Sequence, residues 1–153
     1  MIQEPSKTAG SCPLCSKPGR EIPRNILFQH LDSDGITRTF SWKTAFVCLQ
    51  FDCECLYFSA TRWLSHRHCN KKVGFKNVAP PHVLCHCFGY TGEEIMRSRD
   101  SRPSILEEIQ AYLEKGGHLC EKTNPCGQNC LGAIREFLQR HSLGRNDPTL
   151  PSP

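Results

Sequence analysis

Eleven cysteines in a chain of 153 residues constrain what this protein can fold into more than any other feature. Hydrophobic residues make up 38% of the chain and aromatic residues 8%, so two small units would each be short of apolar surface to bury. Small units of this kind usually depend on disulfides or metals for their stability. The fold class therefore depends on which kind of cross-link the cysteines form.

The cysteines are predicted to bind metals rather than to form disulfides. Eleven thiols cannot all pair, and the first residues contain no apolar segment typical of a secretory signal. No stretch approaches the roughly 18 apolar residues of a membrane span. We therefore expect a cytoplasmic chain with no membrane insertion, in which grouped cysteines are metal ligands. A disulfide scaffold is the alternative.

The order of residue types predicts an α+β fold made of two small units. The first unit has a short helix and antiparallel strands, and the second is helical. A polar, basic stretch that ends in Pro80-Pro81 separates them. The predicted segments are a disordered N-terminus at 1–10, a first unit at 11–60, a basic linker at 61–81, a second unit at 82–142 and a disordered tail at 143–153.

Within the first unit, we expect a short helix or turn, a tight turn and two strands. The turn follows from Asp, Ser and Gly in succession, and the strands from runs of Thr, aromatic and β-branched residues. The expected helix covers Arg24–Leu31, the turn Asp32–Gly35, and the strands Thr37–Phe46 and Cys55–Ser59.

Within the second unit, the pattern predicts three helices. Thr91 and Glu94 form a capping box that opens the first. The other two have apolar residues at helical spacing and glycines after their last turns. They are expected from about Ser101 or Pro103 to Lys115, and from about Cys130 to His141 with an end at Gly144.

One group of cysteines, the first cysteine set, is predicted to bind zinc. It consists of a C-x2-C pair and a C-x4-C pair, which together supply the four thiolates of a tetrahedral structural site. The set is Cys12, Cys15, Cys48 and Cys53. His30 is a possible substitute ligand, and Cys55 is expected to be a packed thiol.

A second group, the second cysteine set, is predicted to hold a [2Fe–2S] cluster. Cys85 and Cys87 precede the capping box, and Cys120 and Cys130 flank a loop of Gly, Pro and Asn between two helices. If the helices fold back on one another, four thiolates converge at one end, which is the ligand set of such a cluster. A four-cysteine zinc site is the rival interpretation.

The second cysteine set also carries a resemblance to known families. The segment VLCHCFGYTGEEI at 83–95 resembles the opening of BFD-like [2Fe–2S] domains, which are named after bacterioferritin-associated ferredoxin. The segment CEKTNPCGQNCLG at 120–132 resembles the N-terminal domain of iron–sulfur-type CopZ copper chaperones. That pattern implies that Cys130 is the last ligand and Cys126 an extra cysteine, although an exchange between these two stays open.

The CopZ resemblance extends over residues 11 to 140. It implies a zinc-binding unit followed by a three-helix BFD-like unit, and it includes the CPLC turn and the CLYFS strand at 55–59. CopZ proteins continue into a heavy-metal-associated domain with an M-x-C-x-x-C copper loop, and no such motif follows Cys130. The resemblance therefore implies the N-terminal domain without the copper-carrying one.

Three functions follow from these features. The resemblance implies an accessory protein that supports copper trafficking by one-electron redox or metal transfer, with a heavy-metal-associated domain protein, a copper ATPase or a redox partner. A BFD-like electron carrier without a copper role and a zinc-stabilised binding module are the alternatives. No Ser/His/Asp set, carboxylate pair or phosphate loop is present, so we expect no enzyme.

Two further features are weaker. A net charge of +4 is a poor indication of nucleic-acid binding. His66, His68 and Cys69 are soft ligands close together on the basic stretch. They could bind Cu(I) or Zn(II) transiently, or they could be solvated linker residues.

Overall fold

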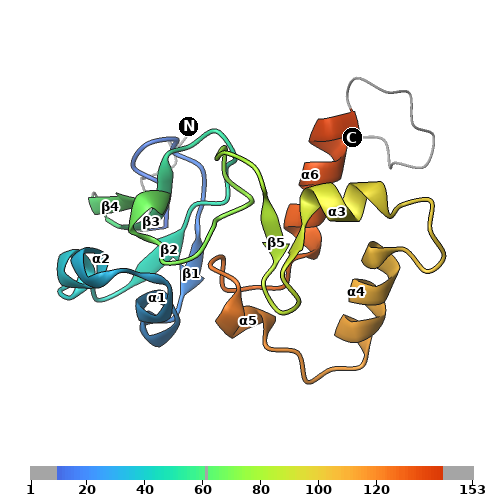
Figure 1. The fold of residues 1–153 in the computed structure, drawn as a ribbon. Helices are drawn as coiled ribbons and strands as arrows, with labels where there is room; N and C mark the ends of the chain where they lie inside the picture. The colour runs from blue at the N-terminus through green and yellow to red at the C-terminus, as the bar shows by residue number, and fades with distance from the viewer. Residues whose placement is uncertain (1–9, 61, 143–153) are drawn as a thin grey trace, which may run out of the picture.

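The computed structural model describes residues 10–60 and 62–142 (Figure 1). It has a four-stranded antiparallel sheet, a two-stranded sheet and six α-helices within those ranges. Figure 1 shows the larger sheet and the first two helices at one end of the molecule, and α3, α4 and α6 at the other. The expected mixture of helices and antiparallel strands is confirmed.

The larger sheet has the strand order β1-β2-β3-β4, with every neighbouring pair antiparallel. The strands are β1 (Arg20–Ile22), β2 (Ala45–Val47), β3 (Cys55–Ser59) and β4 (Arg62–Ser65). In β3, the four residues from Cys55 to Phe58 are each 0% exposed. Both faces of this central strand are therefore covered, which explains its unbroken apolar run.

Two short helices, α1 (Arg24–His30) and α2 (Ser33–Thr39), follow β1. The expected helix in this region is confirmed. The turn expected at Asp32–Gly35 is wrong, because Asp32 caps α2 by accepting a hydrogen bond from the Gly35 N–H at 2.7 Å. The strand expected at Thr37–Phe46 is likewise wrong over most of its length, since α2 continues to Thr39 and β2 begins at Ala45.

The range expected to be a basic linker, 61–81, is largely folded. Within it, β4 pairs with β3, and the 3-10 helix η1 (His66–His68) follows directly. Val73, Phe75 and Lys76 are 2%, 8% and 1% exposed. Apolar residues scattered among Lys and Arg therefore pack into the core, although the basic composition of the range suggested solvation.

The second half contains a small hairpin and four helices. They are β5 (Val83–Cys85), β6 (Tyr90–Thr91), α3 (Gly92–Arg97), α4 (Ile105–Glu114), α5 (Cys120–Thr123) and α6 (Leu131–Ser142). The capping box of Thr91 and Glu94 is confirmed. Helix α4 begins later than expected, because Ser104 and Glu107 form a second capping box. Helix α5 was not expected.

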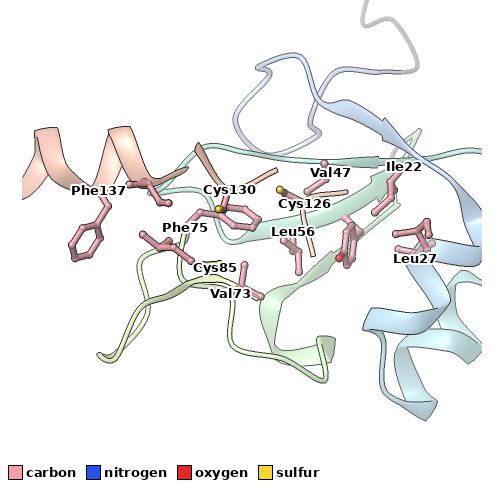
Figure 2. Packing of buried hydrophobic residues seen from close by; sticks show 14 of the residues in the cluster. Ile22, Leu27, Val47, Leu56, Val73, Phe75, Cys85, Cys126, Cys130 and Phe137 are labelled. Carbon is pink, nitrogen blue, oxygen red and sulfur yellow. The ribbon is translucent and has the colours of Figure 1, made fainter. Parts of the chain in front are cut away.

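A continuous core joins the two halves. Figure 2 shows its side chains running from Leu27 and Ile22 through Leu56 and Phe75 to Phe137. The Tyr57 hydroxyl on β3 donates a hydrogen bond to the Pro125 carbonyl at 2.6 Å, which ties the larger sheet to the loop before α6. The two cysteine sets are therefore held by one packed structure.

Two other predictions concern the ends of the chain and membranes. The disorder predicted at 1–9 and 143–153, and the helix end predicted at Gly144, lie outside the described residues. Among the described residues, no helix has the length and apolar character needed to cross a membrane.

Candidate metal centres

The structure brings the first cysteine set together. The Sγ atoms of its four cysteines all lie within 4.8 Å of one another. Those of Cys12 and Cys53 are 3.8 Å apart, and those of Cys15 and Cys48 are 3.7 Å apart. A tetrahedron with Zn–S bonds of about 2.3 Å has sulfur–sulfur distances of about 3.8 Å. The arrangement therefore matches four ligands around a single metal ion.

Backbone hydrogen bonds fix both cysteine pairs of this set. In the CPLC turn, the Cys12 carbonyl accepts from the Ser16 N–H and the Cys12 N–H donates to the Lys17 carbonyl, both at 2.9 Å. Cys48 directly follows β2, and its N–H donates to the Leu56 carbonyl on β3 at 2.8 Å. The turn and the sheet thus present their thiols to the same point.

The two halves of the first cysteine set differ in exposure. Cys12 and Cys48 are 2% and 1% exposed, whereas Cys15 and Cys53 are half-buried. The latter two line a cavity of about 420 Å³ together with Phe51 and with Arg140 of α6. The Arg140 guanidinium lies over the Phe51 ring, 3.3 Å from its centroid. One side of this set is therefore accessible and the other is closed.

The thiols of the first cysteine set perturb one another's ionisation. Hydrogen bonding with Cys55 lowers the pKa of Cys48 to about 4. Burial and the neighbouring thiols raise the pKa of Cys53 to about 12. Like charges this close disfavour joint ionisation unless a cation is shared between them. The electrostatics therefore suit a bound cation.

The structure also places the two neighbours considered as substitutes. Cys55 is 0% exposed, and its Sγ donates to the Tyr57 carbonyl at 3.6 Å. It lies beside Cys48 and Cys12 without belonging to the four-thiol group, which agrees with the expected packed thiol. His30 is buried in α1 and is not part of the group either.

The second cysteine set converges as two pairs. The Sγ atoms of Cys87 and Cys120 lie 3.6 Å apart, and the thiols of Cys85 and Cys130 are close enough to shift each other's pKa. Among the described residues, only the first cysteine set has all its sulfurs within 4.8 Å. The second cysteine set is therefore less compact than the first.

Four different elements position this second set. Cys85 ends β5, and Cys87 follows in the turn of the hairpin, where the Gly89 N–H donates to the Cys85 carbonyl at 2.7 Å. Cys120 opens α5, and Cys130 directly precedes α6. The hairpin and the two helix starts therefore meet at one place, as Figure 1 shows for β5 and α5.

Burial and charge differ between the two pairs. Cys85 and Cys130 are 2% and 1% exposed; in the other pair Cys120 is 4% exposed and Cys87 is half-buried. The hydrogen bond with Cys130, helped by backbone N–H groups in the hairpin, lowers the pKa of Cys85 to about 6. Burial and the Cys87 thiol raise the pKa of Cys120 to about 12. Backbone donors at a sulfur are typical of the surroundings of iron–sulfur clusters.

Two remaining cysteines lie outside these sets. Cys126 is 2% exposed, its Sγ donates to the Gln128 carbonyl at 3.6 Å, and burial raises its pKa to about 11. Cys69 is half-buried, and burial raises its pKa to about 11. Its neighbour His68 faces Asp32 and Asp34, with Nδ1 3.5 and 3.4 Å from their oxygens. Within the described ranges, His66, His68 and Cys69 form no compact ligand group.

One residue that contacts the loop of the first cysteine set was not among the predicted site residues. The Lys76 ammonium donates to the carbonyls of Gln50 at 2.8 Å and Cys53 at 3.2 Å. Lys76 lies in the range expected to be a linker. The one local indication that it could be buried is its position directly after the apolar Phe75. Its partner loop lies more than twenty residues earlier, so no local pattern predicts the contact.

Comparison with known proteins identifies a solved structure with a similar fold. No protein-family model and no curated protein matches the chain. Among solved structures, the X-ray structure of the Archaeoglobus fulgidus CopZ N-terminal domain is similar, with a TM-score of 0.67 and 21% sequence identity. The match covers 83% of this chain and 96% of that chain. The chain therefore has a fold like that of the CopZ N-terminal domain and carries a four-cysteine cluster within it.

Proposed function

We propose that this chain is a metal-binding accessory protein with zinc at the first cysteine set and a [2Fe–2S] cluster at the second, and that it supports copper trafficking through one-electron redox. The observation that carries the proposal is the convergence of eight cysteines into one four-thiol group and two thiol pairs. The likeness in fold to a CopZ N-terminal domain supports it.

Zinc at the first cysteine set serves the fold. Four thiolates at tetrahedral spacing are a typical ligand set for structural zinc, which has no redox chemistry of its own. Cys12 and Cys15 come from the N-terminal turn, and Cys48 and Cys53 flank the loop between β2 and β3. A metal bound by all four would therefore fasten that turn to the sheet.

The second cysteine set supplies the function in this proposal. Cys85, Cys87, Cys120 and Cys130 would hold the cluster, and the cluster, when bound, supplies one-electron chemistry. The hairpin backbone donates hydrogen bonds toward the Cys85 sulfur, which stabilises negative charge there. The half-buried Cys87 gives this set its most exposed sulfur and so a route for an electron to reach a partner.

A copper role would then follow from a balanced transfer. With a cluster held by Cys85, Cys87, Cys120 and Cys130, the chain would supply the one electron that converts Cu(II) to Cu(I), and a cytoplasmic redox partner would supply that electron to the chain. The Cu(I) would be taken by a heavy-metal-associated domain protein or a copper ATPase. In this proposal the chain is an electron carrier and not an enzyme with its own substrate.

Anaerobic metal and sulfide analysis, with EPR of the reduced protein, tests the proposal. We expect about two iron and two sulfide per chain, about one zinc, and an EPR signal from the reduced cluster. Colourless protein with about two zinc ions and no iron would contradict the cluster.

The second candidate function is electron transfer without copper. It is favoured by the sequence, because the chain has only two methionines and lacks an M-x-C-x-x-C motif. Mixing the reduced protein anaerobically with Cu(II) separates the two candidates. Rapid oxidation of the cluster with formation of Cu(I) supports the copper role, and a cluster that stays reduced supports the alternative.

A further inference from the structure

A buried ammonium group lies against the loop that carries two ligands of the first cysteine set. Lys76 is 1% exposed, although lysine is almost never fully buried unless its charge is paired. Its Nζ donates to the carbonyls of Gln50 at 2.8 Å and Cys53 at 3.2 Å. Both acceptors belong to the loop between Cys48 and Cys53, so the lysine fixes the path of that loop.

A neighbouring backbone contact strengthens the same connection. The Asn77 N–H donates to the Phe51 carbonyl at 3.1 Å. Three carbonyls of the loop, at residues 50, 51 and 53, therefore accept hydrogen bonds from residues 76 and 77. The segment expected to be a linker acts as a strap across the ligand loop.

The charge of Lys76 has only a partial counterpart in the Phe75 ring, whose centroid lies 5.9 Å from the Nζ atom. Within the described ranges, no carboxylate is within ion-pair distance of its Nζ. Carbonyl oxygens satisfy its hydrogen bonds but carry no net charge, and a buried uncompensated charge is costly. Four thiolates around a divalent ion leave a net charge of −2. Lys76 also contributes to the lowered pKa of Cys48.

We propose that Lys76 is the internal counter-cation of the first cysteine set: its ammonium orients the loop of Cys48 and Cys53 and offsets part of the charge of a four-thiolate metal site. It thereby determines how tightly the site retains a divalent metal. This inference rests on the proposed zinc binding, and it assigns Lys76 a positioning and electrostatic role rather than a place among the ligands.

Variants of the full chain test this role. Lys76→Met removes the charge and the donors, and Lys76→Gln removes the charge but keeps a donor. The matched control is Lys72→Met, since Lys72 is an exposed lysine of the same segment. Zinc affinity is measured by competition with a chromophoric chelator. We expect both Lys76 variants to bind zinc about 10- to 100-fold more weakly, the range typical of residues that support metal ligands, and Lys72→Met to match the unchanged protein.

Cobalt substitution separates the electrostatic role from general destabilisation. Loss of a positive charge near the thiolates makes them easier to oxidise, so the thiolate-to-Co(II) charge-transfer band should move to longer wavelength in both Lys76 variants. If Lys76→Met fails to fold, Lys76→Gln carries the test.

The outcomes separate this inference from the proposed function. Zinc affinity unchanged in both Lys76 variants, or a charge-transfer band that does not move, would overturn the role of Lys76 while leaving zinc binding intact. If the protein without substitutions binds no zinc, both the proposed zinc site and the inference about Lys76 are refuted.

Discussion

The Sγ atoms of Cys87 and Cys120 lie 3.6 Å apart, although 33 residues separate them along the chain. The hairpin of β5 and β6 presents the first, and the start of α5 presents the second. The Thr123 hydroxyl oxygen, one turn further along α5, is also 3.3 Å from the Cys87 sulfur. One cysteine of the pair is therefore positioned by a short helix, α5, which has little apolar surface of its own. The position of α5 depends on its contacts with the hairpin.

Replacing single cysteines should identify the last cluster ligand. We expect Cys120→Ser and Cys130→Ser to lose most of their iron, about tenfold or more, because each removes one member of a close pair. Cys126→Ala should keep its iron and sulfide, since the Cys126 thiol donates to the Gln128 carbonyl outside the pairs. The measurement is iron and sulfide content after anaerobic reconstitution.

The Cys126→Ala variant also serves as the control for disturbance of this loop. Cys126 is as buried as Cys85 and Cys130, at 2% exposed, so its loss tests packing without removing a pair. Loss of iron in Cys126→Ala together with retention in Cys130→Ser would show that the two cysteines exchange roles.

Removal of zinc should unfold the part of the protein around the larger sheet. Structural zinc contributes about 10–16 kcal/mol in small domains, which is as large as the whole stability of a typical domain, about 5–15 kcal/mol. Trp42 is 6% exposed and belongs to the shared core. Addition of a strong chelator should therefore shift tryptophan emission to longer wavelength and reduce the β-sheet signal in circular dichroism.

Restoring zinc provides the control for this prediction. Both signals should recover when zinc is added in excess, because the change comes from the metal and not from oxidation of the thiols. A metal-free protein with unchanged emission and circular dichroism would show that the first cysteine set is not needed for the fold.

Local patterns in the sequence predicted the features that depend on near neighbours. The C-x2-C turn at Cys12 and Cys15 and the capping box at Thr91 and Glu94 each involve residues a few positions apart, and the structure places both as expected. The C-x4-C pair lies in the single loop between β2 and β3, and its spacing likewise sufficed to predict that it joins the first pair.

Features that depend on contacts between distant parts of the chain could not be predicted from local sequence patterns. The hydrogen bonds of Lys76 to residues 50 and 53 join the expected linker to the first unit across more than twenty residues. The division of the second cysteine set, Cys85 with Cys130 and Cys87 with Cys120, could not be predicted for the same reason. The pairing of β4 with β3 is local, with Arg62 opposite Ser59, and it was overlooked because the segment is basic. Composition alone cannot show which charged segment is buried, because burial is decided by partners elsewhere in the chain.

Removing the Tyr57 hydroxyl should destabilise the joined core. Tyr57 is 0% exposed and its hydroxyl donates to the Pro125 carbonyl at 2.6 Å. In Tyr57→Phe that carbonyl loses its donor, so we expect the free energy of unfolding to fall by about 1–3 kcal/mol. Urea denaturation of the metal-loaded protein measures this change.

A second tyrosine provides the matched control. Tyr112 on α4 is half-buried, and its ring contacts Phe88 with centroids 4.8 Å apart. Tyr112→Phe keeps that ring contact, so its effect should stay within about 0.5 kcal/mol. Equal stability of Tyr57→Phe and the unchanged protein would show that the hydroxyl contact does not stabilise the fold.

His30 makes stability depend on pH. It is 0% exposed, and neither ring nitrogen has a hydrogen-bond partner among the described residues. Burial, together with the nearby Lys71 charge, lowers its pKa from 6.5 to about 4. Between these two values the unfolded chain binds a proton that the folded chain does not, so stability falls as the pH drops from 6.5 toward 4.

The variant His30→Leu should remove this part of the acid sensitivity. Leucine fills a similar space and has no group to protonate. Both proteins lose stability between neutral pH and pH 5, and the loss in His30→Leu should be smaller by about 2 kcal/mol than the loss in the unchanged protein. His86, whose pKa burial lowers to about 4, keeps some of the dependence in both proteins. Urea denaturation at several pH values measures the difference.

Ile26→Val on the same helix is the control, because its cost of about 0.5–1.5 kcal/mol should not change with pH. Parallel curves for His30→Leu and the unchanged protein would show that His30 does not titrate as its burial requires.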